Sequence, residues 1–211
     1  MTILFSGSLN PLHKGHEEFI EKVQNKTWED LFFSLKLGPE LINYLKVTKK
    51  KLGENSNFSE LVQSIEKTLS SLELKEHFLP AEKVKDLLLY LYPSYEVEIS
   101  WAKRPEWFKK IALWNDNLNL LVKSLNAWKI SSLPYEKIYL IKRPNIETMD
   151  YKAIFKKFSI DIELIDLWTS SYTCSSSEII RQYNNWNVAY VRENLSEQVL
   201  NYLRENTELK I

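Results

Sequence analysis

Glycine, cysteine and histidine are all scarce in this chain of 211 residues. There are four glycines, one cysteine and three histidines, whereas glycine alone is usually about 7% of a globular protein. A single cysteine excludes an intrachain disulfide framework, and by itself it cannot form a cysteine zinc site. Lysine plus arginine and aspartate plus glutamate both number 28, so the formal net charge is zero. We therefore expect no broad electrostatic capture of nucleic acid, although a local basic pocket is compatible with this balance.

Long apolar runs are absent as well. No segment approaches the roughly 18–20 apolar residues that a bilayer-spanning helix needs, and the N-terminus lacks the basic segment of a secretory signal. We expect a cytoplasmic protein, with a nuclear location left open, and no membrane partner. The chain is 44% hydrophobic and 27% charged, which is enough apolar content for a folded core. Its length fits one domain, or one domain with an insertion.

The apolar pattern alternates between strand-like and helix-like segments. The strand-like runs are residues 2–6, 95–100, 137–142 and 160–167. Helical spacing covers residues 105–126, 150–157, 176–184 and 195–205, and almost all of 27–92. Strands separated by helices predict an α/β fold with a mostly parallel, doubly wound sheet. We expect one domain over residues 1–211, with a helical insertion at about 27–92.

The rarest residues gather in one segment near the N-terminus, Gly7-Ser-Leu-Asn-Pro-Leu-His13-Lys-Gly15-His16. The two glycines permit a tight strand-to-loop turn and close approach of a ligand to the main chain. A helix that begins at Gly15 and His16 would point its unsatisfied N–H groups and positive dipole end at this loop, which makes an anion site. The imidazoles of His13 and His16 can donate hydrogen bonds to charge that develops on a phosphate. The segment therefore predicts phosphoryl chemistry.

This segment resembles the nucleotidylyltransferase superfamily, whose members carry a pattern of the form G-(S/T)-F-(D/N)-P-x-H-x-G-H after the first strand. Asn10 stands where many members have aspartate. The resemblance implies a Rossmann-like nucleotidylyltransferase fold with His13 and His16 as catalytic residues. It also implies an ATP-binding site composed of Ser6, Gly7, Ser8, Gly15 and His16.

A serine cluster near the C-terminus supplies the second pattern, Cys174-Ser-Ser-Ser-Glu-Ile-Ile-Arg181. Serines cap the first amides of a helix, and a phosphate can use both the hydroxyls and those amides. The segment resembles the superfamily's I-S-S-T-x-I-R pattern. That resemblance implies ATP binding by Ser175, Ser176 and Ser177, and a catalytic, phosphate-binding role for Arg181.

Four further segments are similar to nicotinamide or nicotinate mononucleotide adenylyltransferases in particular. They are Ser100–Trp107, Asn126–Lys129, Ile138–Pro144 and Val188–Leu203. The resemblance implies a mononucleotide site, for which the candidates are Trp101, Trp128, Asp116, Arg143 and Lys50. Trp101 and Trp128 are the stacking candidates, because an indole face holds a pyridine ring well and a cationic pyridine ring better still.

Together these patterns predict an adenylyltransferase that transfers AMP from ATP to nicotinamide or nicotinate mononucleotide and releases pyrophosphate. Mg²⁺ would be bound through the ATP phosphates, and no protein ligand to a metal is predicted. A homo-oligomer stays open. Three alternatives also stay open: a cytidylyltransferase or another nucleotidylyltransferase with a different acceptor, a degenerate nucleotide-binding member without catalysis, and a helical interaction protein with a chance pattern.

Overall fold

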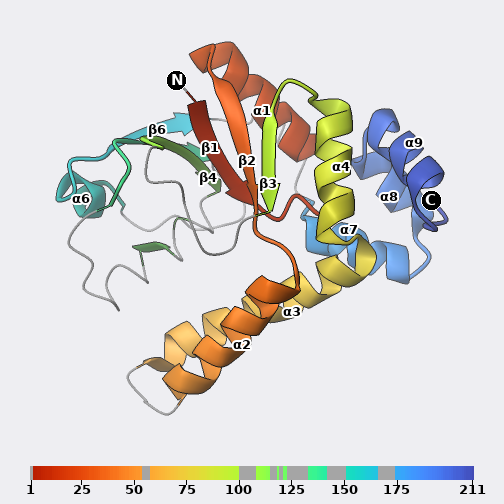
Figure 1. Cartoon of the computed structure of the whole chain (residues 1–211), viewed down its shortest axis with the longest axis horizontal. Helices are drawn as coiled ribbons and strands as arrows, with labels where there is room; N and C mark the ends of the chain where they lie inside the picture. The colour runs from red at the N-terminus through yellow and green to blue at the C-terminus, as the bar shows by residue number, and fades with distance from the viewer. Residues whose placement is uncertain are drawn as a thin grey trace.

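One sheet of six parallel strands, in the order β3-β2-β1-β4-β5-β6, organises the computed structural model (Figure 1). The structure describes residues 2–53, 58–99, 108–114, 118, 121–122, 133–141, 151–165 and 174–211. The strands are β1 Thr2–Gly7, β2 Asp30–Leu35, β3 Glu96–Ile99, β4 Lys110–Trp114, β5 Lys137–Ile141 and β6 Asp161–Ile165. The helices are α1 Lys14–Thr27, α2 Pro39–Gly53, α3 Ser59–Phe78, α4 Ala81–Leu91, α6 Tyr151–Lys156, α7 Ser176–Asn184, α8 Val188–Asn194 and α9 Glu197–Asn206. None of these helices is long and apolar enough to cross a membrane.

Helices cover both faces of the sheet. Ile3 and Phe5 of β1 belong to a large apolar cluster that they share with α1, α4, α7, α8 and α9. Leu4, between them, belongs to a second cluster that includes Phe155 of α6. Successive side chains of a strand point to opposite faces, so the two clusters lie on the two sides of the sheet. The expectation of a doubly wound α/β fold with a Rossmann-like sheet is thereby confirmed.

A hairpin of two helices, α2 and α3, projects from the end of the sheet toward which the strands run (Figure 1). It begins at Gly38, whose φ of 101° lies in the left-handed region that favours glycine. Its outer part has a small apolar cluster of its own, built on Leu52, Ile65 and Leu69. The hairpin and α4 make most of the segment 27–92 helical.

Two strands contradict the helical reading of the sequence. β2 lies at Asp30–Leu35, inside the 27–92 segment, and β4 lies at Lys110–Trp114, inside the helix expected at 105–126. All residues from Leu31 to Leu35 are buried, because a parallel strand inside a doubly wound sheet is covered on both faces. Such a strand has no polar alternation, and its two leucines mimic helical i, i+4 spacing.

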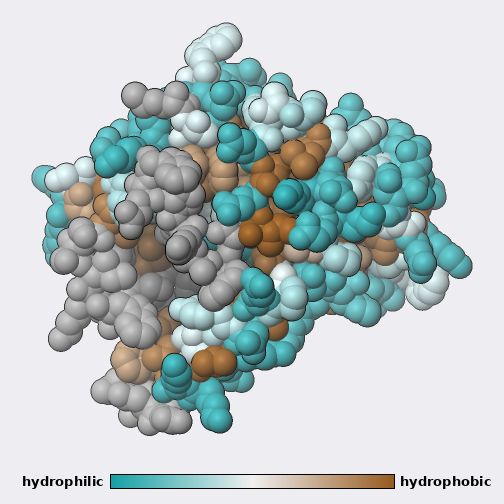
Figure 2. All heavy atoms as spheres, in the orientation of Figure 1, coloured by the Kyte–Doolittle hydropathy of each residue, from teal (hydrophilic) through white to brown (hydrophobic). Residues whose placement is uncertain are grey.

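The surface over α4, α8 and α9 is mostly hydrophilic (Figure 2). Hydrophobic atoms gather in a narrow strip over the edge strand β3, where Val97 and Ile99 are only partly buried against the core.

Candidate active site

The order in which the chain adds strands to the sheet reverses at β1. β1 pairs with β2 on one side and with β4 on the other, so the chain builds outward to β3 and then returns to start the second half. Parallel sheets bind ligands at the carboxyl ends of the strands next to such a switch point. The segment from Ser8 to His13, which joins β1 to α1, lies at this end.

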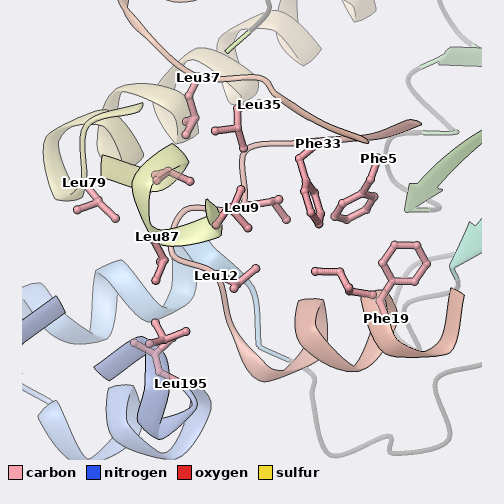
Figure 3. Close-up of a cluster of buried hydrophobic side chains, with 14 of the residues drawn as sticks. Phe5, Leu9, Leu12, Phe19, Phe33, Leu35, Leu37, Leu79, Leu87 and Leu195 are labelled. Atoms are coloured by element: carbon pink, nitrogen blue, oxygen red, sulfur yellow. The ribbon is translucent and has the colours of Figure 1, made fainter. Parts of the chain in front are cut away.

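Apolar side chains anchor this loop in the core. Leu9 and Leu12 are buried among Phe33, Leu87 and Leu195, as Figure 3 shows. Leu9 has a φ of 48°, in the left-handed region, which costs a non-glycine residue roughly 1–2 kcal/mol. Burying a leucine side chain contributes about 1.5–3 kcal/mol, so the packing of Leu9 is sufficient to hold the strained turn.

The two histidines of the motif meet at the start of α1. His13 precedes the first residue of the helix, and its main-chain N–H donates to Nδ1 of His16 over 3.3 Å. The imidazole rings stack with centroids 3.7 Å apart and an interplanar angle of 25°. Because Nδ1 of His16 accepts this hydrogen bond, a neutral His16 carries its proton on Nε2 and can donate from there.

Burial strengthens the hydrogen bonds that these imidazoles can donate to an anion. His13 is 2% exposed and His16 is 4% exposed, and hydrogen bonds to an anion are worth more where water is excluded. Trp114, the last residue of β4, presents an edge-on ring contact to His16 at 5.8 Å between centroids. A residue at the carboxyl end of β4 therefore packs against the His16 ring of α1.

Helix α7, which begins with the serine cluster, is hydrogen-bonded to the same loop. The hydroxyl of Ser176 donates to the main-chain oxygen of Pro11 over 3.1 Å, in a buried contact that spans 165 residues of sequence. Ser175 caps α7 by accepting from the N–H of Glu178, and the hydroxyl of Ser177 lies 2.9 Å from that of Ser71 on α3. All three hydroxyls thus have structural partners, and the first main-chain N–H groups of α7 are the groups that would face an anion.

The three remaining residues of the first motif lie at the end of β1 and the start of α1. Ser6 is buried in β1 opposite Ser34 of β2, and Gly15 is buried in the first turn of α1. Gly7 ends β1, and a Cβ atom added to it would meet nothing within 4 Å. The space in front of Gly7 is therefore open to a ligand.

Arg181 and Lys50 are not gathered with these groups. The guanidinium of Arg181 pairs with the carboxylate of Glu178 on the same helix, and its side chain is 64% exposed. Lys50 lies in the last turn of α2, at the outer end of the hairpin and about 16 Å of helix rise beyond Pro39. Four other candidates for the mononucleotide site fall outside the described residues, and these are Trp101, Trp128, Asp116 and Arg143.

Two residues at the site carry no sequence signal. Lys75 of α3 donates from its ammonium to the hydroxyl of Ser8 over 2.6 Å, and Trp114 supports His16. Both contacts join residues more than 65 positions apart. No spacing rule along the chain predicts such a contact.

A partly buried carboxylate follows the two histidines in α1. Glu17 follows His16 on α1, and burial raises the pKa of its carboxyl, although a hydrogen bond from Ser196 and the charge of Lys14 act in the opposite direction. The Ser196 hydroxyl donates to Glu17 over 2.8 Å, and the Lys14 ammonium donates to the main-chain oxygen of Glu193 over 2.6 Å. These contacts fix the start of α1 against α8 and α9.

Solved structures similar to this chain include two of one enzyme. Both are nicotinic acid mononucleotide adenylyltransferase from Plasmodium falciparum, one complexed with NaAD and the other with APC. Each is 16% identical to this chain with a TM-score of 0.47, and the match covers 97% of this chain and 95% or 94% of the other. No family model matches the sequence. No similar sequence is found among curated proteins.

Proposed function

We propose that this protein is an adenylyltransferase that transfers AMP from ATP to nicotinamide or nicotinate mononucleotide, forming the dinucleotide and pyrophosphate. The observation that carries the proposal is the convergence of both phosphate motifs at the switch point of the sheet. His13 and His16 stack at the start of α1, and Ser176 of α7 is hydrogen-bonded to the loop that precedes them. The N-termini of α1 and α7 and the two imidazoles would then bind one polyphosphate.

The reaction needs positioning and charge stabilisation, and it needs no covalent intermediate. The phosphate of the mononucleotide would attack the α-phosphorus of ATP in line, and pyrophosphate would leave. His13 and His16 would donate hydrogen bonds to the oxygens on which negative charge develops. The open space in front of Gly7 would admit the nucleotide to the main chain, and the first turn of α7 would hold the leaving phosphates. Arg181 would join them by exchanging its pairing with Glu178 for the phosphates.

Mg²⁺ would enter as the Mg-ATP complex. Within the described parts of the chain, no group of three or more histidine, cysteine, aspartate or glutamate side chains is arranged to hold a metal ion. Phosphate oxygens are the usual ligands of Mg²⁺ in such reactions, and we propose that the nucleotide carries the ion. The ion would neutralise charge on the leaving phosphates.

The acceptor is proposed on the sequence resemblance. Trp101 and Trp128 would stack on the pyridine ring, with Asp116 and Arg143 as further candidates for the mononucleotide site. Lys50 is not among them, because it lies at the outer end of the hairpin. We propose a cytoplasmic enzyme that acts on ATP and a pyridine mononucleotide, without nucleic-acid or membrane partners.

A pyrophosphate-release assay tests this function. The full chain is given Mg-ATP with nicotinamide mononucleotide, nicotinate mononucleotide, flavin mononucleotide or phosphopantetheine in turn. We expect turnover with a pyridine mononucleotide, and a loss of about 10²–10³-fold in kcat for His16→Ala, the size expected when a transition-state donor is removed. His77→Ala is the matched control, because His77 is exposed in the last turn of α3.

Each result has a distinct meaning. Turnover with another acceptor, or with CTP in place of ATP, would retain the chemistry and replace the substrate. ATP binding without turnover on any acceptor would contradict the proposal and favour a nucleotide-binding protein without catalysis.

A further inference from the structure

The C-terminal end of α3 is hydrogen-bonded in two ways to residues 8–13, the motif loop that joins β1 to α1. The ammonium of Lys75 donates to the hydroxyl of Ser8 over 2.6 Å. The side-chain amide of Asn10 donates to the main-chain oxygens of Lys75 and Leu79, over 2.8 and 2.5 Å. Lys75 is therefore held to the loop both through its side chain and through its main chain.

The contacts of Asn10 require an amide at this position. Asn10 is fully buried, and the two oxygens that it faces are carbonyls, which only accept hydrogen bonds. They also lie at the C-terminus of α3, where the helix carries partial negative charge. An aspartate carboxylate there would place acceptor against acceptor and charge against like charge. Asn10 therefore suits this fold in a way that the aspartate of many superfamily members would not.

The same helix reaches the second phosphate motif. Ser71 lies one turn before Lys75 on α3, and its hydroxyl is 2.9 Å from that of Ser177 in the first turn of α7. One face of α3 thus contacts both the loop after β1 and the start of α7. The ammonium of Lys75 lies beside Ser8, next to the open space in front of Gly7.

Two other cations near the motifs, Arg181 and Lys14, bind groups away from the loop. Arg181 pairs with Glu178, and Lys14 donates to the main chain of Glu193. Lys75, by contrast, holds its ammonium against the motif loop, at the hydroxyl of Ser8. A phosphate oxygen binds an ammonium more strongly than a neutral hydroxyl does, so the bond from Lys75 to Ser8 can be exchanged for, or extended to, a bond to phosphate.

We propose that Lys75 is a phosphate-binding residue of the nucleotide site and that Asn10 is the residue that positions it. The α2–α3 hairpin is then part of the site, because it delivers this cation. The identity of the ligand as a nucleoside triphosphate rests on the proposed function. Lys75 acts on the β- and γ-phosphates, which ATP carries and AMP lacks.

Binding of Mg-ATP and of AMP to the full chain, without any mononucleotide, tests the role of Lys75. For Lys75→Met we expect the Kd for Mg-ATP to rise about tenfold or more, as the loss of a charge-assisted hydrogen bond predicts, while the Kd for AMP stays unchanged. Lys75→Arg keeps the charge and should restore much of the affinity. Lys67→Met is the matched control, since Lys67 is an exposed lysine two turns earlier on α3.

The double variant tests whether Asn10 acts through Lys75. Asn10→Asp alone should weaken Mg-ATP binding, but it should add little in the Lys75→Met background, because contacts that share one partner are not additive. Thermal unfolding of each variant reports whether it is folded. If Asn10→Asp does not fold, the comparison of Lys75→Met with Lys67→Met still decides the role of the lysine.

Three results would overturn the proposal. One is an unchanged Kd for Mg-ATP in Lys75→Met, another is an equal loss of ATP and AMP affinity, and the third is an equal effect of Lys67→Met. Failure of the proposed function is distinguishable, because it shows as absent turnover with any acceptor while the wild-type chain still binds Mg-ATP.

Discussion

Individual side chains at the switch point take their geometry from the main chain and from one another. The main-chain N–H of His13 sets the orientation of the His16 ring, and the Trp114 ring supports it from the neighbouring strand. Trp114 is only 5% exposed and also packs against Phe19 of α1. Its role in this account is to position His16.

Replacement of Trp114 by leucine tests that role. We expect Trp114→Leu to lower kcat by roughly ten- to a hundredfold, because a misplaced group loses its alignment, with a smaller change in the KM for ATP. Trp114→Phe keeps a ring at this position and should retain more of the kcat. Steady-state kinetics on both variants provide the measurement. A fall in melting temperature with kcat unchanged would assign Trp114 to stability alone.

The motif residues could be found from the sequence because the chemistry there is local. Residues 7–16 carry two glycines and two histidines within one short segment, and the structure stacks the two imidazoles. Lys75 and Trp114 could not be found in this way, since each reaches the loop or His16 from a distant segment. The motif resemblance did not indicate that Arg181 pairs with Glu178. That pairing follows from helical i, i+3 geometry.

At the scale of elements, the sequence predicts helices better than buried strands. The hairpin helices and α7 have amphipathic spacing, and α7 begins with its serine cap where the pattern indicates. β2 and β4 are buried on both faces and show only a short apolar run, which periodicity cannot separate from a buried helix. The overall order of strands and helices was still sufficient to predict the parallel sheet.

Docking of α7 on the motif loop depends on the Ser176 contact. Ser176→Ala leaves the buried oxygen of Pro11 without this donor, which costs about 1–3 kcal/mol. We expect a lower melting temperature and a higher KM for ATP, because the two phosphate motifs lose their direct link. Ser70→Ala is the control, since the Ser70 hydroxyl also donates to a main-chain oxygen but in an exposed position. Equal effects of the two substitutions would contradict the account.

For the whole molecule, two carboxyls with opposite pKa shifts predict how stability depends on pH. Burial raises the pKa of Glu17, so the folded protein binds this proton more tightly and loses stability as the pH rises from 4.5 through the folded pKa. Hydrogen bonds from Lys137 and then Lys26 lower the pKa of Glu163, so its contribution is present above 4.5 and is lost as the pH falls through its folded pKa.

Glu17→Gln and Glu163→Gln should therefore change the melting temperature in opposite directions. At pH 7 we expect Glu17→Gln to raise it and Glu163→Gln to lower it. The latter change corresponds to at most about 1 kcal/mol, because the ion pairs of Glu163 are partly exposed. Both differences should shrink toward zero in acid, where the wild-type carboxyls become neutral. Calorimetry over a pH series measures this, and parallel curves for the two variants would contradict it.

The central claim is that the two stacked histidines at the switch point catalyse dinucleotide formation. Its most direct test is detection of the dinucleotide together with pyrophosphate, after incubation of the full chain with Mg-ATP and a pyridine mononucleotide. We expect the wild-type chain to form dinucleotide and pyrophosphate in equal amounts, and His77→Ala to do so at the same rate. His16→Ala should lose about 10²–10³-fold in rate. No dinucleotide from a wild-type chain that binds Mg-ATP, or full activity in His16→Ala, would contradict it.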